Sequence, residues 1–248
     1  MSINLSKIST KAPKELDKIS VKEKLVSIIE ELNVLQNLLF AEGKHSVLVV
    51  IQGMDASGKD GAIKNIFGTL NPQGVAVASF KAPTPEELAH DFLWRIHQHA
   101  PVKGSIQVFN RSHYEDVLVT RVHKMIDDET AYKRMEAINH FEKLLCEHNK
   151  TEVLKFYLHV SKEEQLQRLQ ERISDEKKQW KYNANDFLES ELWDDYMKAY
   201  EDCFEKCDHV PWTIVPSDQN WYKEYVIATT LLNTLKKLDM KYPGMKKS

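Results

Sequence analysis

The sequence predicts an α/β fold in which a central parallel sheet of about five strands lies between two layers of helices. Two observations lead to this prediction. Short runs of β-branched and aliphatic residues, typical of strands covered on both faces, alternate with longer segments in which apolar residues recur at helical spacing. The first apolar run, residues 47–51, leads directly into a glycine-rich loop and then into a helical pattern.

The glycine-rich loop, residues 53–61, reads Gly-Met-Asp-Ala-Ser-Gly-Lys-Asp-Gly and fits the pattern Gly-x-x-x-x-Gly-Lys. Backbone N–H groups of such a loop and of the first helical turn have no intrahelical partners, and phosphate oxygens can take their place. A chance Gly-Lys turn would not need the strand and the helix beside it. We therefore expect a P-loop kinase-like, three-layer α/β/α domain. The expected phosphate contacts are Gly53, Ala56, Ser57, Gly58, Lys59 and Gly61.

Two carboxylates stand inside this loop. Asp60 occupies the position where a Ser or Thr hydroxyl usually holds Mg²⁺, and Asp55 adds a second negative charge. Each would repel a nearby phosphate charge by about 4 kcal/mol at an effective dielectric constant of 20. We therefore expect Asp55 and Asp60 to hold a divalent cation, Mg²⁺ or Mn²⁺. Asp60 could instead complement the positive end of the following helix, but this alternative leaves Asp55 unexplained.

Composition limits the classes of partner and compartment. The 248 residues suit one α/β domain, 1–248, and their formal net charge of -3 gives no global field that would recruit nucleic acid or an anionic membrane. Cys146, Cys203 and Cys207 are an odd set without paired metal-ligand spacing, as in a reducing compartment. No hydrophobic signal segment or membrane-spanning run is found. We expect a cytoplasmic protein that binds neither nucleic acid nor membranes.

The rest of the chain supplies four further strands and the helices between them. Residues 1–19 are a polar, Pro-containing lead-in. Ser20-Val-Lys-Glu23 fits a capping box that starts a helix, which would pack on the domain or on another subunit. The further strands are expected at 75–80, 105–109, 153–160 and 212–215. Helices outside the loop and the lid are expected at 20–40, 84–99, 117–125, 132–149, 187–207 and 221–238.

A polar segment follows the third strand directly. Ligands of parallel sheets bind at the carboxyl ends of the strands, so we expect this segment to face the glycine loop. Arg111 is suited to clamp a phosphate through its bidentate guanidinium. Glu115 and Asp116 could contact a metal ion, directly or through water, or hold the acceptor. A solvated turn is the alternative, but the buried strand favours a binding role. The expected nucleotide contacts are Asn110, Arg111, Glu115 and Asp116.

Residues 162–186 form a charged segment after the fourth strand. Arginines four residues apart on a helix, followed by a lysine cluster, resemble the closing lid of a small nucleotide kinase. The lid cations would be Arg168, Arg172, Lys177, Lys178 and Lys181. On this helix we expect Leu166 and Leu169 to face inward, and Gln165, Arg168 and Arg172 to face outward. Acidic neighbours offset much of the charge, so a solvated, salt-bridged helical hairpin fits the sequence equally well.

Three motifs together resemble the polyphosphate kinase 2 family. They are Gly53–Gly61, Phe109–Asp116, and a stretch from Ser161 through Trp180-Lys181, Trp193 and Tyr196 to Pro211-Trp212. The likeness covers nearly the whole domain, from Leu35 to Leu232. It implies a thymidylate-kinase-like fold that uses Mg²⁺ to transfer phosphate between inorganic polyphosphate and nucleoside mono-, di- and triphosphates, under a basic lid over the polyphosphate. It also implies a homo-oligomer, either a dimer or a tetramer.

The family's functional residues carry over onto this sequence. Asp55 matches the catalytic aspartate, Lys59 the loop lysine, and Arg111 the arginine after the third strand. Our hypothesis is that polyphosphate lies along the loop and the lid, while the acceptor nucleotide approaches Arg111 and Glu115. Mg²⁺ on Asp55 and Asp60 would bridge the reacting phosphates. Phosphate acceptors are already ionised, so alignment and charge neutralisation matter more than a general base. The expected catalytic set is Asp55, Lys59, Asp60 and Arg111.

The chain departs from the family at one position. Many members have Asp where this chain has Asn110. The missing carboxylate would have to be replaced in the metal shell by Asp60, Glu115 or Asp116. The sequence of residues 110–116 is most similar to that of members that accept both nucleoside mono- and diphosphates.

Two other functions fit parts of the pattern. An ATP-dependent nucleoside monophosphate kinase would use the same sheet, loop and lid, although Asp60 in place of a hydroxyl argues against it. A non-catalytic nucleotide-binding module is the second alternative. Two carboxylates in its loop would hinder nucleotide binding unless metal chemistry required them.

Overall fold

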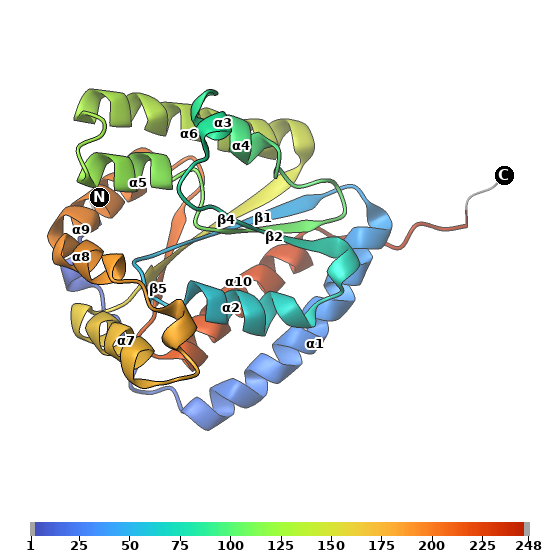
Figure 1. The fold of residues 1–248 in the computed structure, drawn as a ribbon. Coiled ribbons are helices and arrows are strands. Elements are labelled where there is room, and N and C mark those ends of the chain that lie inside the picture. The colour runs from blue at the N-terminus through green and yellow to red at the C-terminus, as the bar shows by residue number, and fades with distance from the viewer. Residues whose placement is uncertain (1–2, 246–248) are drawn as a thin grey trace.

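The computed structural model describes residues 3–245 and places five strands between two layers of helices (Figure 1). The strands are β1 (Ser46–Gln52), β2 (Val75–Ser79), β3 (Ile106–Asn110), β4 (Thr151–His159) and β5 (Trp212–Pro216). They lie in the order β2-β3-β1-β4-β5, and every neighbouring pair is parallel. The predicted α/β/α fold with a central five-stranded parallel sheet is confirmed.

Strand β1 lies in the middle of the sheet, and all of its residues are buried. Such a position suits an unbroken run of β-branched and aliphatic side chains, because both faces of the strand are covered. Ile51 pairs with Asn110 of β3 and with Phe156 of β4. The ends of β1 and β3 are therefore level. The backbone N–H of Arg111 donates to the carbonyl oxygen of Ile51 at 3.1 Å, which places the segment after β3 beside the loop after β1.

Helices cover both faces of the sheet. One face carries α1 (Lys18–Glu42), α2 (Lys59–Ile66) and α10 (Asn220–Lys237), and the other carries α5 (Glu115–Val122), α6 (Asp128–Asn149) and α9 (Trp193–Lys206) (Figure 1). The side chains of β1 alternate between the two cores. Val47, Val49 and Ile51 belong to the first, whereas Leu48 and Val50 belong to the second.

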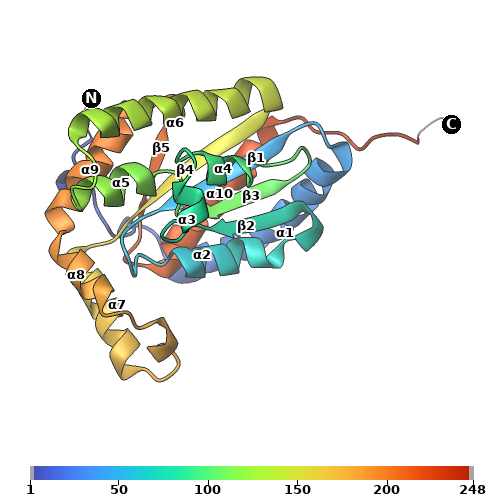
Figure 2. The same ribbon diagram turned by 45° about the horizontal axis from the view of Figure 1, so that its top comes forward.

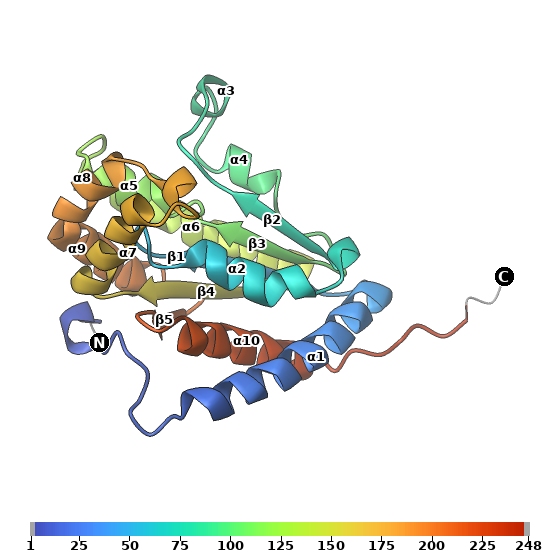
Figure 3. The ribbon, with the colours of Figure 1, turned by 60° about the horizontal axis from the view of Figure 1, so that its bottom comes forward.

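The shorter helices stand outside these layers. Helices α7 (Lys162–Ser174) and α8 (Asn185–Glu191) project from the body as a hairpin (Figure 2), and a short 3₁₀ turn, Gln179–Lys181, lies between them. Helices α3 (Pro85–Leu88) and α4 (Trp94–His97) connect β2 to β3, and Figure 3 shows α3 standing away from the sheet. None of the helices within residues 3–245 is long and apolar enough to cross a membrane.

The predicted start of the first helix is wrong. Helix α1 begins at Lys18, and its N-cap is Asp17, whose carboxylate accepts a hydrogen bond from the backbone N–H of Ser20 at 2.7 Å. A capping box at Ser20 is therefore excluded, because Ser20 already lies inside the first turn. Aspartate is as good an N-cap as serine. Asp17 lies three residues before Ser20 and accepts the hydrogen bond from the Ser20 backbone N–H.

Two predicted helices are interrupted. The helix expected at 84–99 is divided into α3 and α4, because the side chain of Asp91 accepts a hydrogen bond from the N–H of Leu93 at 2.9 Å and forms a local turn. The predicted capping box at its start is present, since Thr84 and Glu87 bond reciprocally. The helix expected at 187–207 is divided into α8 and α9 at Leu192.

The faces of α7 also differ from the prediction. Gln165 is buried, and its side-chain amide donates to the backbone oxygen of Asp55 at 3.0 Å. Leu166 is 40% exposed. Leu169 is buried as expected. The prediction for Gln165 and Leu166 is wrong because α7 packs on the glycine loop, whose backbone offers a hydrogen-bond acceptor rather than an apolar surface.

The lead-in packs on the domain through polar and apolar contacts. Leu5 is buried, and its backbone N–H donates to the carboxylate of Glu201 at 2.7 Å. Thr10 and Asp218 make two hydrogen bonds, one between side chains at 2.7 Å and one between backbones at 3.0 Å. Asp218 also accepts from the N–H of Ser161 at 2.8 Å. The lead-in is thus joined to the turn between β5 and α10, close to the start of α7.

Candidate active site

The glycine loop depends on two glycines in left-handed conformations. Gly53 has φ of 153° and Gly58 has φ of 96°. A Cβ atom on Gly53 would lie 2.8 Å from Ser57 Oγ, and one on Gly58 would lie 2.1 Å from Lys223 Nζ. Side chains at these two positions would therefore collide with the rest of the site. Glycine allows the backbone to turn tightly from β1 into α2, which begins at Lys59.

Lys59 lies under the loop, and its ammonium group bonds to neutral oxygens. Its Nζ donates to the carbonyl oxygens of Gly53 at 2.7 Å and Met54 at 3.1 Å. Burial and the nearby charge of Arg111 lower the pKa of Lys59 to about 8. The hydroxyl of Ser57 is also buried and has no hydrogen-bond partner within residues 3–245. An anion bound in the loop would satisfy both groups better than the carbonyls do.

Arg111 connects the end of β3 to the glycine loop. Its guanidinium pairs with the carboxylate of Asp55 and, at 3.3 Å, with that of Glu115. Although burial opposes it, the charges of Glu115 and Asp55 raise the pKa of Arg111 above its ordinary value. Arg111 also has a φ of 62°, an uncommon backbone conformation for a residue other than glycine. The structure thus brings together three predicted site residues from two adjacent strand ends.

Asp60 is paired in the same way, but with different partners. One carboxylate oxygen accepts from the amide of Asn110 at 2.9 Å, and the other lies 3.5 Å from Lys181 Nζ. Although burial acts against it, the bond from Asn110 and the charges of Lys181 and Lys59 lower the pKa of Asp60. Asn110 therefore acts as a hydrogen-bond donor to a loop carboxylate.

The donor set suits a hard divalent cation that is shared with phosphate. Asp55 and Asp60 supply carboxylate oxygens from the same loop, and Ser57 adds a buried hydroxyl with no partner among the described residues. Residues 3–245 hold no group of three or more His, Cys, Asp or Glu side chains that could bind a metal without further ligands. Mg²⁺ is usually held in this way, by one or two carboxylates, by water and by substrate phosphates.

Asp116 is engaged away from the loop. Its carboxylate lies 3.3 Å from the guanidinium of Arg95, which also donates to the carbonyl oxygen of Lys81 at 2.9 Å. The backbone oxygen of Asp116 accepts from Arg134 at 2.8 Å. Burial raises the pKa of Asp116. These contacts link α5 to α4 and α6, so the expected nucleotide contact of Asp116 stays a prediction.

Arg168 holds the glycine loop from outside. Its guanidinium donates to the carbonyl oxygens of Ala56 and Ser57, both at 3.1 Å, and to those of Ser217 at 2.8 Å and Asp218 at 2.9 Å. The predicted outward orientation is therefore wrong, because these backbone oxygens draw the side chain inward. Arg168 joins the loop to the turn before α10, and a direct contact with polyphosphate stays a prediction.

Three of the other lid cations, Arg172, Lys178 and Lys181, pair with carboxylates. Arg172, also predicted to face outward, has a side chain only 18% exposed and pairs with Asp186 of α8. Lys178 lies 2.6 Å from Glu171 on the lid itself. Lys181 reaches across to Asp60 of the loop, and its ammonium also lies over the Trp180 ring at 5.0 Å from the centroid. The backbone oxygen of Lys177 accepts from the Trp180 indole at 3.1 Å. Of these cations, Lys181 is the one that joins the lid to a predicted metal ligand.

Three residues at the site, Gln165, Glu189 and Lys223, carry no local signal in the sequence, whereas Tyr196 belongs to the third motif. Gln165 and Lys223 bond to the backbone of the loop from α7 and α10. Glu189 and Tyr196 line a small pocket beside Asp55, and the Tyr196 hydroxyl donates to Glu189 at 2.6 Å. The aromatic residues of α9 have the spacing of a core face, and Tyr196 is indeed largely buried. Proximity to the loop arises only when the chain folds.

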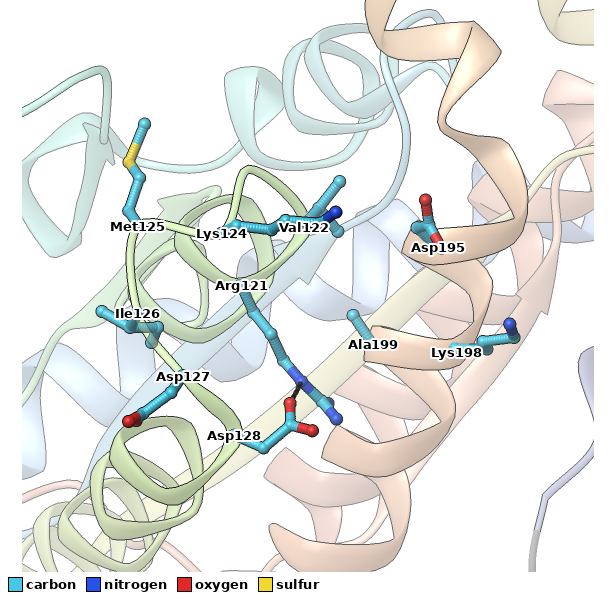
Figure 4. Close-up of a pocket in the computed structure, with 10 residues that line it drawn as sticks. All are labelled: Arg121, Val122, Lys124, Met125, Ile126, Asp127, Asp128, Asp195, Lys198 and Ala199. Atoms are coloured by element: carbon cyan, nitrogen blue, oxygen red, sulfur yellow. Dashed lines mark hydrogen bonds and ion pairs between the residues drawn. The ribbon is translucent and has the colours of Figure 1, made fainter.

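A larger cavity of about 620 Å³ lies where α5, α6 and α9 meet (Figure 4). It is lined by Arg121, Val122, Lys124, Met125, Ile126, Asp127, Asp128, Asp195, Lys198 and Ala199. Arg121 lies in its wall and bonds to Asp128 at 2.7 Å. The small pocket beside Asp55 is lined by the same two helices, α5 and α9, through Val119 and Tyr196. The two hollows therefore share their helical walls.

Comparisons of the sequence identify its relatives. Residues 15–243 match the family described as polyphosphate kinase 2. An AMP/ADP-polyphosphate phosphotransferase of Meiothermus ruber is 48% identical over 223 residues, which are 89% of this chain and 83% of that protein. An ADP-polyphosphate phosphotransferase of Rhodopseudomonas palustris is 42% identical over 235 residues, or 89% of this chain and 81% of that protein.

Comparison of the fold with solved structures leads to the same family. The crystal structure of polyphosphate kinase 2 from Arthrobacter aurescens TC1 matches 99% of this chain and 89% of its own, with a TM-score of 0.95 and 39% identity. The crystal structure of a protein described as polyphosphate kinase 2 from Pseudomonas aeruginosa matches 95% of this chain and 49% of its own, with a TM-score of 0.84 and 29% identity.

Proposed function

Because the chain belongs to the polyphosphate kinase 2 family, we propose that it is a polyphosphate:nucleotide phosphotransferase. In this reaction the terminal phosphate of inorganic polyphosphate passes to AMP or ADP, giving ADP or ATP, and the transfer is reversible. The observation that carries the proposal is that each loop carboxylate is paired with a cation from another element, Asp55 with Arg111 and Asp60 with Lys181.

Each pair joins a proposed metal ligand to a proposed phosphate ligand. Charge-assisted bonds to phosphate oxygens are strong enough to replace ion pairs that solvent can still reach, so entering phosphates would draw Arg111 and Lys181 away from the carboxylates. Asp55 and Asp60 would then be free to hold Mg²⁺ or Mn²⁺. A polyphosphate chain presents anionic oxygens along its whole length, which suits cations placed on both the loop and the lid.

The roles of the chain's own residues follow from this arrangement. Lys59 and the loop N–H groups hold the donor phosphate, and Arg111, supported by Glu115, orients the acceptor phosphate. A divalent cation held by Asp55 and Asp60 would neutralise charge between the two phosphates. A general base is not required, because the attacking oxygen belongs to an already ionised phosphate.

We further propose that the nucleoside of the acceptor occupies the cavity shown in Figure 4. Its volume of about 620 Å³ falls in the range of small-molecule sites. It shares α5 and α9 with the small pocket beside Arg111. Replacing Ala199, which lines the cavity, by Leu should raise the KM for ADP about tenfold, a loss of roughly 1.4 kcal/mol of binding. An unchanged KM for ADP, in a variant with the wild-type melting temperature, would contradict this placement.

One assay separates the candidate functions. The protein is incubated with Mg²⁺, polyphosphate and AMP or ADP in the absence of ATP, and newly formed ADP and ATP are measured. Formation of these products, abolished by a chelator, is the expected result. Transfer only when ATP is supplied as donor would identify an ATP-dependent nucleoside monophosphate kinase. Nucleotide binding without any transfer would identify a non-catalytic module.

The family resemblance also supports a homo-oligomer, a dimer or a tetramer, while the net charge and the cysteine content support a protein that acts in the cytoplasm without nucleic acid or membrane partners. We include this in the proposal. Light scattering coupled to size-exclusion chromatography measures the oligomeric state directly, and a monomeric mass at assay concentration would refute that part.

A further inference from the structure

Lys223 is a buried lysine behind the glycine loop. It lies in the first turn of α10, its residue is 0% exposed, and its Nζ donates to the carbonyl oxygens of Gly58 at 3.2 Å and Ser57 at 3.4 Å. A third bond, at 2.9 Å, goes to the side-chain oxygen of Asn220. No carboxylate in the described part of the chain lies within 4.0 Å of this ammonium.

Burying a lysine in this position costs free energy of folding. An ammonium group loses its hydration when it is buried, and neutral oxygens compensate only part of that loss. Burial and the nearby charges of Arg168 and Lys59 lower the pKa of Lys223 to about 7, although Glu224 and Glu164 act in the opposite direction. An apolar side chain would fill the same space without this penalty, so the lysine calls for an explanation beyond packing.

The geometry of the glycine loop supplies an explanation for the buried lysine. A trans peptide group points its carbonyl oxygen and its N–H in opposite directions. The carbonyl oxygens of Ser57 and Gly58 are held by Lys223, and those of Ala56 and Ser57 by Arg168. Both cations approach from the side of α7 and α10. The N–H groups across the same peptide planes therefore point the other way, into the loop.

The absence of a side chain at residue 58 fits this arrangement. A Cβ atom there would lie 2.1 Å from Lys223 Nζ. Gly58 thus makes room for the ammonium as well as permitting a φ of 96°. Gly58 and Lys223 therefore fit together in space, although 165 positions separate them in the sequence.

We propose that Lys223 is a positioning residue for phosphate binding, which fixes the 57–58 and 58–59 peptide groups so that the N–H groups of Gly58 and Lys59 point at the donor phosphate. Lys223 does not touch the substrate. The role rests on the proposed function, because it assumes that the loop binds the donor. It predicts that Lys223 affects the donor and spares the acceptor, whose phosphate lies at Arg111.

The experiment compares Lys223→Met with Lys223→Gln. Methionine fills the space but donates no hydrogen bond, whereas glutamine is neutral and still donates. Lys236→Met is the matched control, because Lys236 lies on the same helix and pairs with Glu31 on α1, at 2.7 Å. For each variant we measure kcat, the KM for polyphosphate, the KM for ADP, and the melting temperature with and without tripolyphosphate.

Lys223→Met is expected to raise the KM for polyphosphate about tenfold, as for the loss of one charge-assisted hydrogen bond, and to leave the KM for ADP within about twofold. Lys223→Gln should recover at least half of that loss on a logarithmic scale, and Lys236→Met should behave as wild type. The stabilisation that tripolyphosphate gives should shrink in Lys223→Met.

Three results would overturn the proposal. Unchanged KM values with a lower melting temperature would make Lys223 a packing residue, and an equal rise of both KM values would mean a general loss of the site. If Lys223→Met does not fold, Lys223→Ala, which also lacks the donor, takes its place, and a KM for polyphosphate that rises no more than the KM for ADP in that variant would refute it. Absence of polyphosphate-dependent transfer in the wild type would refute the proposed function instead, and tripolyphosphate binding would still test Lys223.

Discussion

The glycine loop and the lid both carry cations that we assign to phosphate, but the two regions hold their cations differently. Around the loop, Lys59, Arg168 of α7 and Lys223 of α10 donate to backbone carbonyl oxygens and are largely buried, although Arg168 also pairs with Glu164 at 2.8 Å. On the lid, Lys178 and Lys181 pair with carboxylates, and their side chains are 46% and 36% exposed.

This difference separates a rigid part of the site from an exchangeable one. A backbone carbonyl is fixed by the fold, so a cation bonded to it defines a geometry that exists before the substrate arrives. An exposed ion pair contributes little stability, so a phosphate can replace it at low cost. The loop is therefore preorganised, whereas the lid can exchange partners as it closes. The following predictions test this comparison, from the largest expected effect to the smallest.

The largest effect is expected at Asp55, which lies in the glycine loop and pairs with Arg111. Asp55→Asn keeps the size of the side chain but removes the charge that would hold the metal. We expect kcat to fall by about 10³-fold, while the free energy of unfolding changes by less than roughly 1 kcal/mol. Initial rates and urea denaturation measure the two quantities. Substantial turnover in this variant would contradict a metal-holding role for Asp55.

A smaller effect distinguishes two lysines of the lid. Lys181 contacts the loop through Asp60, whereas Lys178 pairs with Glu171 on the lid itself. Lys181→Ala should raise the KM for polyphosphate about fivefold and weaken its dependence on salt, and Lys178→Ala should change it less than about twofold. Steady-state kinetics at two ionic strengths gives both values. Equal effects would mean that contact with the loop does not single out Lys181.

The smallest effect concerns stability. The pKa of Lys223 is lowered to about 7 in the folded protein from its ordinary value of 10.5, through burial and the charges of Arg168 and Lys59, with Glu224 and Glu164 opposing. As pH rises above 7, the folded state loses a proton that the unfolded state keeps, so this group makes the protein more stable with rising pH until about 10.

Wild type should therefore gain about 1 kcal/mol of stability relative to Lys223→Met between pH 7 and pH 8. Taking the difference between the two proteins removes the contribution of Lys59, which titrates in the same range. Chemical denaturation at the two pH values measures the gain. A constant difference between wild type and variant would indicate that Lys223 titrates outside this range.

The sheet could be predicted because its signals are local. The apolar run of β1, the glycine loop and the start of α2 are adjacent in the sequence, and the rule that ligands lie at the carboxyl ends of parallel strands then placed Arg111 near Asp55. The three motifs also led to the family, which the comparisons confirm. The residues of the first two motifs lie in segments whose structure depends mainly on neighbours in the chain.

The features that the sequence did not predict depend on distant contacts. Helical spacing predicted that the side chains of Gln165 and Arg168 face outward. Both instead face inward, because they bond to the backbone of the glycine loop, about 110 positions earlier in the sequence. Lys223 and Glu189 come to the site from segments with no motif of their own. A side-chain bond at Asp91 divides a helix whose apolar spacing is otherwise regular. In each case a polar contact overrides the hydrophobic pattern.

The lead-in has a consequence for handling the protein. Thr10 holds Asp218, whose backbone oxygen accepts from Arg168 at 2.9 Å, and Arg168 in turn bonds to the glycine loop. A protease that cuts between Ser9 and Lys18 would free one end of this chain of contacts. We expect such a nick to weaken phosphate binding although every ligand-binding side chain survives intact.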